Sequence, residues 1–315
     1  MKNTIYIVTY HYVRNIKNSN YPNLKGLEFE EFKKQINYFK KNFNILKPDI
    51  FIKYIKEKRL PKKTSILLTF DDGYKDHYEY VFPYLKKNNL QGCFYPPASI
   101  VKQKKILDVN KIQFLMSKEK NRKKILLKIK NILKKKYNFF LDDFLKVNKN
   151  KIKNLKSKFD DKETLLIKSL LQKLLPIRKR KFVIDQLFKE IVTNNFKKFS
   201  SELYLSLENI KEMIKYGMHF GSHGYNHEWW SKLAKEKQEK EIVKSIKFLK
   251  QIGVKKNNLS VCYPFGSFNN HTISILKKYS FKFGLTTSQQ EIDLSNIENF
   301  LTLPRYDTNY FKNFY

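Results

Sequence analysis

Two adjacent carboxylates, Asp71 and Asp72, follow the apolar run 66–70 and precede Gly73. An apolar run of this length that ends at a glycine is typical of a buried strand, so both carboxylates are expected at its carboxyl end. Neighbouring carboxylates repel each other and are costly to bury unless a cation or hydrogen bonds offset their charge. The pattern indicates a cation site at a strand end, although Asp-Asp-Gly equally suits a solvated turn.

Three of the six histidines fall within nine residues, at positions 219, 223 and 227. His223 and His227 are four positions apart, and glycines at 221 and 224 let the backbone turn tightly beside a ligand. Imidazole and carboxylate are the usual donors to a zinc-type divalent ion, and three protein ligands leave a position for water. The spacing equally suits two histidines on the polar face of a helix.

Together these motifs resemble those of the polysaccharide deacetylases of the NodB-homology superfamily, carbohydrate esterase family 4. The family's Thr-Phe-Asp-Asp-Gly signature matches residues 69–73 without change, and its Ser-His-x-x-x-His element matches residues 222–227. Its Pro-(Tyr/Phe)-Gly loop matches residues 264–266. The resemblance covers roughly residues 3–100 and 205–310. It implies a distorted (β/α)7-type barrel that hydrolyses an acetamido group on a sugar.

The resemblance also implies a role for each matched residue. Asp72, His223 and His227 would bind one divalent metal ion, zinc or else cobalt, nickel or manganese. Asp71 would be the general base that takes a proton from water. The backbone N–H near Phe265 would help to stabilise the tetrahedral oxyanion.

Two residues that the family pattern leads us to expect are missing, so other residues must take their roles. Cys262 stands where many members have an arginine, and the best substitute is Arg305, which could orient Asp71 by a charge-assisted hydrogen bond. Members usually end with a Leu-x-x-His whose imidazole is the general acid, but no histidine follows His271. Some circularly permuted relatives, the poly-N-acetylglucosamine deacetylases, place that histidine on the first strand. His11 is the candidate here, with a satisfied core histidine as the alternative.

Alternating apolar and amphipathic segments predict an α/β fold whose parallel sheet is closed or nearly closed into a barrel. The predicted strands lie near residues 4–11, 64–70, 91–96, 218–222, 259–263, 282–287 and 300–305. Residues 28–43 and 232–251 are predicted helices. Residues 103–204 lack glycine, and their apolar residues recur at helical spacing. We expect one domain, residues 1–315, interrupted by a lysine-rich helical insertion of about 100 residues at 103–204.

The chain has 315 residues and a net charge of +35, yet only six of its 64 basic residues are arginines. Surfaces that read bases or clamp phosphates favour arginine, so a sequence-specific nucleic-acid role is disfavoured. More than half of the positive excess lies within residues 101–200. It reflects compositional bias, or a basic face that attracts anionic lipid headgroups or acidic glycans.

No apolar segment of signal-peptide or membrane-span length follows Met1, so we expect a cytoplasmic protein, with peripheral contact at the inner face of the membrane as an option. That location favours an acetylated sugar or glycan precursor, which could be lipid-linked, over a finished wall polymer. Two alternatives stay open. One is hydrolysis of a non-sugar amide or imide. The other is a catalytically silent glycan-binding or membrane-associated scaffold, which the two departures favour and the intact metal and base residues oppose.

Five aromatic residues and two cysteines complete the set of residues that the sequence singles out. Five aromatic residues near the expected mouth could stack on sugar rings or pack in the core: Tyr74, Tyr225, Trp229, Trp230 and Phe268. Cys93 and Cys262 lie in apolar, strand-like contexts, which indicates reduced core residues rather than a disulfide framework.

Overall fold

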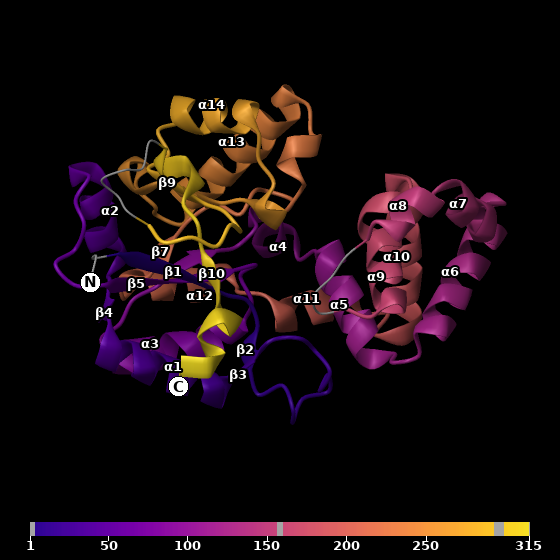
Figure 1. The fold of residues 1–315 in the computed structure, drawn as a ribbon, viewed down its shortest axis with the longest axis horizontal. Coiled ribbons are helices and arrows are strands. Elements are labelled where there is room, and N and C mark those ends of the chain that lie inside the picture. Colours follow the sequence, from indigo (N-terminus) through magenta and orange to yellow (C-terminus); the bar gives the residue numbers. More distant parts are fainter. Residues whose placement is uncertain (1–3, 156–159, 293–298, 315) are drawn as a thin grey trace. The chain divides into compact units, whose positions relative to one another are not determined.

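The computed structural model describes residues 4–155, 160–292 and 299–314, and the chain divides into two compact units (Figure 1). Unit 1 comprises residues 1–15, 26–105 and 200–315. Unit 2 comprises residues 16–25 and 106–199. Residues 156–159, which belong to the predicted insertion, lie outside the described residues.

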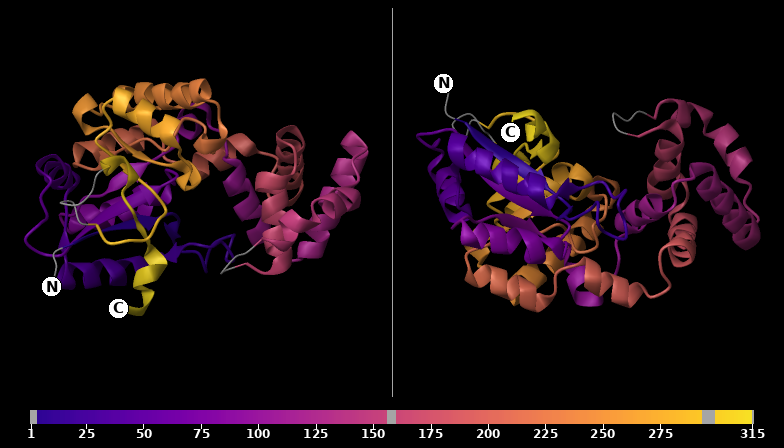
Figure 2. Two further views of the ribbon diagram at one scale, coloured as in Figure 1. Left: turned by 45° about the horizontal axis from the view of Figure 1, so that its top comes forward. Right: turned by 90° about the horizontal axis from the view of Figure 1, so that it is seen from below.

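Parallel strands form the centre of unit 1, and helices surround them (Figure 2). The main sheet has the order β10–β1–β5–β6–β7, and all its pairings are parallel. Its strands are β1 (Ile5–Tyr10), β5 (Ser65–Asp71), β6 (Cys93–Tyr95), β7 (His219–Phe220) and β10 (Tyr306–Asp307). A short strand, β4 (Asn44–Ile45), pairs with the first half of β5, while β6 pairs with its second half.

Two further strands, β8 (Ser260–Cys262) and β9 (Phe283–Leu285), connect the edges of this sheet and pair with each other in parallel. Ser222, shortly after β7, pairs with β8, and β9 pairs with Leu303, shortly before β10. Because β10 pairs with β1, these bridges complete a ring of seven parallel strand segments. The predicted α/β fold of the distorted (β/α)7 type is confirmed.

Six of the seven predicted strands occupy their expected places. The seventh, predicted over residues 300–305, is wrong in its first half, because Phe300–Thr302 form a 3₁₀ helix. Asn299 begins that helix by accepting a hydrogen bond from the N–H of Leu301. Strand pairing starts only at Leu303 and continues in β10. The apolar pattern arose because Leu301 and Leu303 are both buried, not because the strand is continuous.

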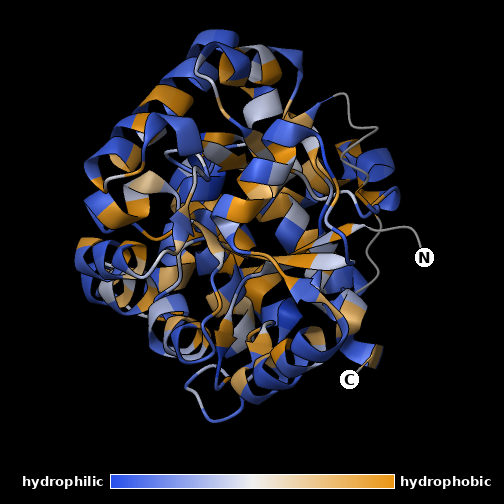
Figure 3. Cartoon of the chain, turned by 90° about the vertical axis from the view of Figure 1, so that its left-hand side faces the viewer, coloured by the Kyte–Doolittle hydropathy of each residue, from blue (hydrophilic) through white to orange (hydrophobic). Residues whose placement is uncertain are grey.

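Side chains of the strands alternate between two cores. One set lies inside the barrel and comprises Ile5, Ile7, Leu67, Cys93, Tyr95, Cys262, Phe283, Leu285 and Leu303. The other set, which includes Val8 and Phe70, packs against the surrounding helices. Figure 3 shows that the helices carry both hydrophobic and hydrophilic residues. Both cysteines are buried.

The helices of unit 1 each bury one apolar stripe against the strands. They are α1 (Phe29–Asn42), α2 (Pro48–Glu57), α3 (Phe82–Lys87), α4 (Ala98–Gln103), α12 (Leu207–Lys215), α13 (Lys235–Gln251) and α14 (Asn270–Lys278). In α1, Phe32, Ile36 and Phe39 recur at helical spacing and are buried, which fixes the face that contacts the sheet. The helices predicted over residues 28–43 and 232–251 are confirmed as α1 and α13.

Unit 2 is built from helices around an aliphatic core. The helices are α5 (Asp108–Lys118), α6 (Arg122–Tyr137), α7 (Leu141–Val147), α8 (Lys149–Lys153), α9 (Lys162–Ser169) and α10 (Ile177–Ile191), and α11 (Phe196–Leu203) follows them. Ile125, Ile129 and Leu133 give α6 its buried face. The helical character of this stretch is confirmed, but its status as an insertion into one domain stays a prediction. No helix among the described residues is long and apolar enough to cross a membrane.

The buried imidazole of His219 on β7 makes the stability of the fold depend on pH. Its Nε2 lies 2.7 Å from the hydroxyl of Ser260, and burial lowers the pKa of His219 from 6.5 to about 4. Between these pH values the unfolded chain binds a proton that the folded chain does not, so folding is weakened as the pH falls. We expect His219 alone to lower the free energy of unfolding by up to about 3 kcal/mol across this range.

Urea unfolding at neutral pH and at pH about 4.5 measures this effect. The variant His219→Gln should lose less stability on acidification than the wild type. His271→Gln is the matched control, because His271 is exposed on α14. Identical pH dependence in all three proteins would contradict the assignment.

Candidate active site

Asp71, the last residue of β5, lies inside the barrel in the same phase as Leu67. Its Oδ1 accepts a hydrogen bond from Arg305 Nη1 at 3.0 Å, and its Oδ2 accepts one from Arg305 Nη2 at 2.8 Å. Oδ2 also accepts from the hydroxyl of Thr9 and the thiol of Cys262, each at 3.3 Å. Asp71 and Arg305 are only 2% and 3% exposed, so the pair is shielded from water.

This environment keeps Asp71 ionised. Burial alone would raise the pKa of Asp71, but the charge and the hydrogen bonds of Arg305 oppose burial and help to hold that pKa below its usual range. Oδ2 is crowded by three donors, whereas among the described residues Oδ1 accepts from Arg305 only. A carboxylate oxygen has two lone pairs, so Oδ1 is the atom with capacity to accept a proton.

The backbone leaves the regular strand conformation at Asp72. Its φ is +66° and that of Gly73 is +64°, both in the left-handed region that non-glycine residues seldom adopt. Gly73 is required here, since an added Cβ would lie 2.5 Å from the Cβ of Pro96. The buried carboxylate of Asp72 accepts a hydrogen bond from the Tyr74 hydroxyl at Oδ2, at 2.6 Å. Its Oδ1 has no hydrogen-bond partner within the described part of the chain.

His223 and His227 lie in the loop after β7 rather than on a helix. Their Nε2 atoms are 3.2 Å apart, and each lies 3.4 Å from Oδ1 of Asp72. Nδ1 of His223 donates to the carbonyl oxygen of Cys262 at 2.7 Å, so in the neutral ring Nε2 carries the free lone pair. Burial lowers the pKa of His227 to about 3, which keeps that imidazole neutral.

The atoms Asp72 Oδ1, His223 Nε2 and His227 Nε2 fit a divalent cation. A buried carboxylate oxygen without a donor is costly, and a cation in contact with it would offset that cost. One carboxylate and two imidazoles are a donor set that zinc and its first-row neighbours accept. The carbonyl of Cys262 orients His223, and the hydroxyl of Tyr74 orients Asp72, as second-layer partners do at metal sites.

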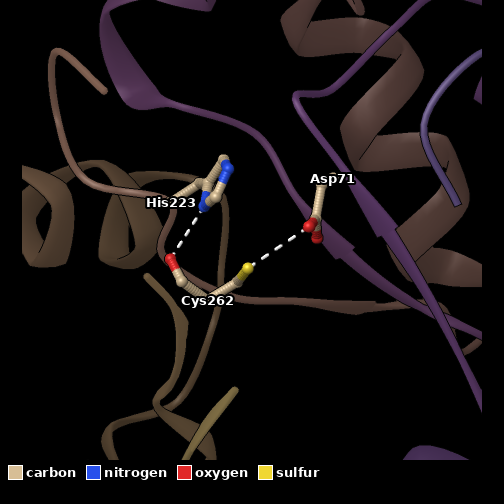
Figure 4. A group of neighbouring side chains, drawn as sticks. All are labelled: Asp71, His223 and Cys262. Atoms are coloured by element: carbon tan, nitrogen blue, oxygen red, sulfur yellow. Dashed lines mark hydrogen bonds between the residues drawn. The ribbon is translucent and has the colours of Figure 1, made fainter. Parts of the chain in front are cut away.

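A second group of donors, Asp71, His223 and Cys262, lies beside the first (Figure 4). Figure 4 shows the Cys262 thiol directed at Asp71 and the Cys262 carbonyl directed at His223. The guanidinium of Arg305 already supplies a positive charge here, with Nη2 3.0 Å from the Cys262 sulfur. A metal ion would be repelled by that charge, so this group does not fit a second cation.

His11 directly follows β1, and its side chain is exposed. The alternative of a core histidine is therefore wrong. Its charge contributes to lowering the pKa of both Asp71 and Asp72, which places the imidazole within electrostatic range of both carboxylates. The backbone carbonyl of His11 accepts a hydrogen bond from Nε2 of His77 at 2.8 Å, which fixes the chain at this point. The role of His11 as general acid stays a prediction.

Phe265 lies beside the histidines in a turn of positive φ, +58°. Its ring stacks on Trp229 with centroids 4.2 Å apart and an interplanar angle of 3°, and its centroid lies 4.5 Å from that of His227. Left-handed backbone at Asp72, His227 and Phe265 thus gathers at one place, as strained residues do at functional sites. The role of the Phe265 N–H stays a prediction.

Among the aromatic residues expected at the mouth, Tyr74 and Trp230 are fully buried, so sugar stacking is wrong for both. Tyr225, Trp229 and Phe268 are partly buried. Thr9 and the Tyr74 hydroxyl were not recognised as site groups from the sequence. Thr9 shares the inward phase of Ile5 and Ile7 on β1, which could have identified it.

A barrel that gathers two carboxylates, two imidazoles and an arginine at one end has the layout of a hydrolase. The polysaccharide deacetylase family model matches residues 58–284, which include Asp71, Asp72, His223 and His227. This chain belongs to the polysaccharide deacetylase family, and it is a hydrolase of carbon–nitrogen bonds other than peptide bonds. No curated protein matches the chain in sequence.

Several solved structures share the fold. The Streptococcus pyogenes deacetylase PplD, in complex with acetate, is 18% identical with a TM-score of 0.59, over 96% of this chain and 92% of that one. IcaB from Ammonifex degensii is 17% identical with a TM-score of 0.57, over 99% and 94% of the two chains. The BpsB deacetylase domain from Bordetella bronchiseptica is 15% identical with a TM-score of 0.56, over 96% and 95%.

The hydrogen bond from Tyr74 to Asp72 predicts an effect on metal affinity. Tyr74→Phe removes the hydroxyl but keeps the ring, which stacks on Tyr12 at 3.9 Å. We expect zinc affinity, measured by titration calorimetry, to fall roughly 10- to 100-fold while the fold persists. Tyr279→Phe is the control, since its hydroxyl bonds Glu239 on the surface. Unchanged zinc affinity in Tyr74→Phe would contradict this orienting role.

Proposed function

We propose that this enzyme removes N-acetyl groups, or O-acetyl groups, from an acetylated sugar or glycan precursor with the aid of one divalent metal ion. Zinc is our first choice, and cobalt, nickel or manganese would suit the same donors. The observation that carries the proposal is the buried, unpaired Oδ1 of Asp72, 3.4 Å from the Nε2 atoms of both His223 and His227. Membership of the deacetylase family supports the acetyl group as the target.

Asp71 would act as the general base. Its Oδ1 has a free lone pair and would take the proton of the attacking water, while Arg305 keeps the carboxylate ionised and in place. An ion bound by Asp72, His223 and His227 would supply Lewis acidity, which polarises a carbonyl and eases deprotonation of water. The water oxygen would form a bond to the acetyl carbon as its proton moves to Asp71.

Two further groups would complete the reaction. The backbone N–H near Phe265 would donate to the oxyanion that develops on the acetyl oxygen. His11 would donate a proton to the leaving amine, because an amine leaves poorly as an anion. Cleavage of the carbon–nitrogen bond then releases acetate and a free amino sugar. The acetate in the similar Streptococcus pyogenes structure is the product that this reaction would release.

The substrate that we propose is an acetylated sugar or glycan precursor in the cytoplasm, which could be lipid-linked. The cytoplasmic location stays a prediction, which cell fractionation would test. Release of acetate from an acetylated amino-sugar oligomer, compared with a non-sugar amide or imide, separates the sugar substrate from the first alternative. A silent scaffold would release acetate from neither.

The metal assignment predicts that the ligand variants Asp72→Ala and His223→Ala lose the bound ion. Each removes one donor from the group, so we expect less than stoichiometric metal by elemental analysis and essentially no acetate release. Asp71→Asn is the matched control, since Asp71 is beside the ligands without being one. That variant should keep the metal and lose roughly two to four orders of magnitude in rate.

Stoichiometric metal in both ligand variants would overturn the metal assignment. Full activity of Asp71→Asn on an acetylated amino sugar would show that another residue is the base. Circular dichroism and thermal unfolding of each variant establish that the fold survives.

The role of His11 predicts a change in the pH profile. A general acid must carry its proton, so the rate of the wild type should fall on the alkaline side as that proton is lost. His11→Ala should be slower by roughly two to four orders of magnitude, with a flattened alkaline limb and unchanged metal affinity. His271→Ala is the control, because His271 is exposed on α14. An alkaline limb that persists in His11→Ala would disprove the role.

A further inference from the structure

Unit 2 carries a cluster of basic residues where the end of α6 meets the beginning of α10. We call this surface the α6–α10 patch, and its basic residues are Lys134, Lys135, Lys136, Arg178, Lys179 and Lys181. Contacts between the two helices hold it together. Lys179 Nζ lies 4.5 Å from the ring centroid of Tyr137, and Lys136 Nζ lies 5.7 Å from that of Phe182. The rings of Tyr137 and Phe182 are themselves 5.7 Å apart.

The positive charges of the patch are not neutralised by carboxylates. Within the described residues, none of the six forms an ion pair. The nearest acids along the chain pair with other lysines: Asp142 with Lys130, Asp143 with Lys146, and Asp185 with Lys111. A partner of opposite charge would therefore meet six cations that have no carboxylate partner among the described residues.

Helix stability does not account for this arrangement. Lysines 134–136 in the last turn of α6 suit the negative end of the helix dipole. The cations of α10 are placed unfavourably with respect to the helix dipole. Arg178 and Lys179 occupy the first turn of α10, which is the positive end of its dipole, and that turn has no acidic residue. The cations at the start of α10 are therefore not explained by the helix dipole.

Two apolar side chains border the cations and are open to solvent. Phe140 is 51% exposed and Ile177 is 49% exposed, and Lys134 Nζ lies 5.8 Å from the ring centroid of Phe140. Apolar side chains among lysines are typical of surfaces that enter the headgroup region of a bilayer. Nucleic acid fits less well, since five of the six cations are lysines and an aliphatic Ile177 has no role in base readout.

We propose that the α6–α10 patch binds unit 2 to a bilayer rich in anionic phospholipid. Its cations lie at the headgroups, and Phe140 and Ile177 enter the boundary between headgroups and acyl chains. This inference stands apart from the proposed catalysis, because its test measures membrane binding rather than acetate release. It assigns a task to the helical unit and would bring the enzyme to the surface where lipid-linked sugars lie.

The test is cosedimentation of the whole protein with vesicles. We expect binding to vesicles that contain about one third phosphatidylglycerol in phosphatidylcholine, and none to pure phosphatidylcholine. Each basic residue near an anionic bilayer contributes roughly fivefold in affinity, so K134Q/K135Q/K136Q should bind roughly 100-fold more weakly. The control K235Q/K237Q/K240Q changes the same charge on exposed positions of α13 and should bind nearly as the wild type.

The variant F140S/I177S tests the apolar component and should weaken binding roughly tenfold without altering its salt dependence. An equal loss of vesicle binding in both lysine variants would overturn the proposal that this patch is the binding surface, since binding would then follow net charge alone. Equal binding to pure phosphatidylcholine would also overturn it. Tighter binding to duplex DNA than to the anionic vesicles at the same salt would assign the surface to nucleic acid instead.

Discussion

The buried ion pair between Asp71 and Arg305 joins the chemistry of the site to the closure of the barrel. Arg305 lies between Leu303, which pairs with β9, and β10, which pairs with β1, so its guanidinium ties the closing segment to β5. It also donates to the Thr286 carbonyl and the Thr69 hydroxyl, at 3.0 and 3.2 Å. Two charges this deeply buried are tolerated because they are paired and hydrogen-bonded, and removing one partner typically costs about 3–5 kcal/mol.

The same pair gives the two neighbouring carboxylates different electrostatic environments. Asp71 faces inward through the regular alternation of β5 and is neutralised by Arg305, whereas Asp72 reaches the site through a left-handed turn and faces two imidazoles. Cys262 stands where many sequences of the family have an arginine. Its small side chain contacts the guanidinium that arrives from another strand, at 3.0 Å. The arginine is thus supplied from a different position, with its charge beside Asp71.

Local pattern predicted most of the fold. The strands were predictable because both of their faces are buried, and His223 and His227 were recognisable from their spacing and type. The strand predicted over residues 300–305 was wrong in its first half. A 3₁₀ helix there buries Leu301, and Leu303 after it is also buried, which gives the same apolar pattern as a strand. Features that depend on long-range contacts could not be predicted from the local sequence pattern. Positive φ at Asp72 is imposed by its surroundings, and residues 16–25 join unit 2 through contacts that no local periodicity encodes.

Crystals grown with zinc test most directly whether Arg305 leaves one cation site rather than two. We expect a single anomalous scattering peak at about 2.0–2.2 Å from Oδ1 of Asp72 and from the Nε2 atoms of His223 and His227, with the Asp71–Arg305 pair intact. A zinc ion bonded to the sulfur of Cys262, with Arg305 displaced, would contradict this, as would the absence of any peak between Asp72 and the two histidines at saturating zinc.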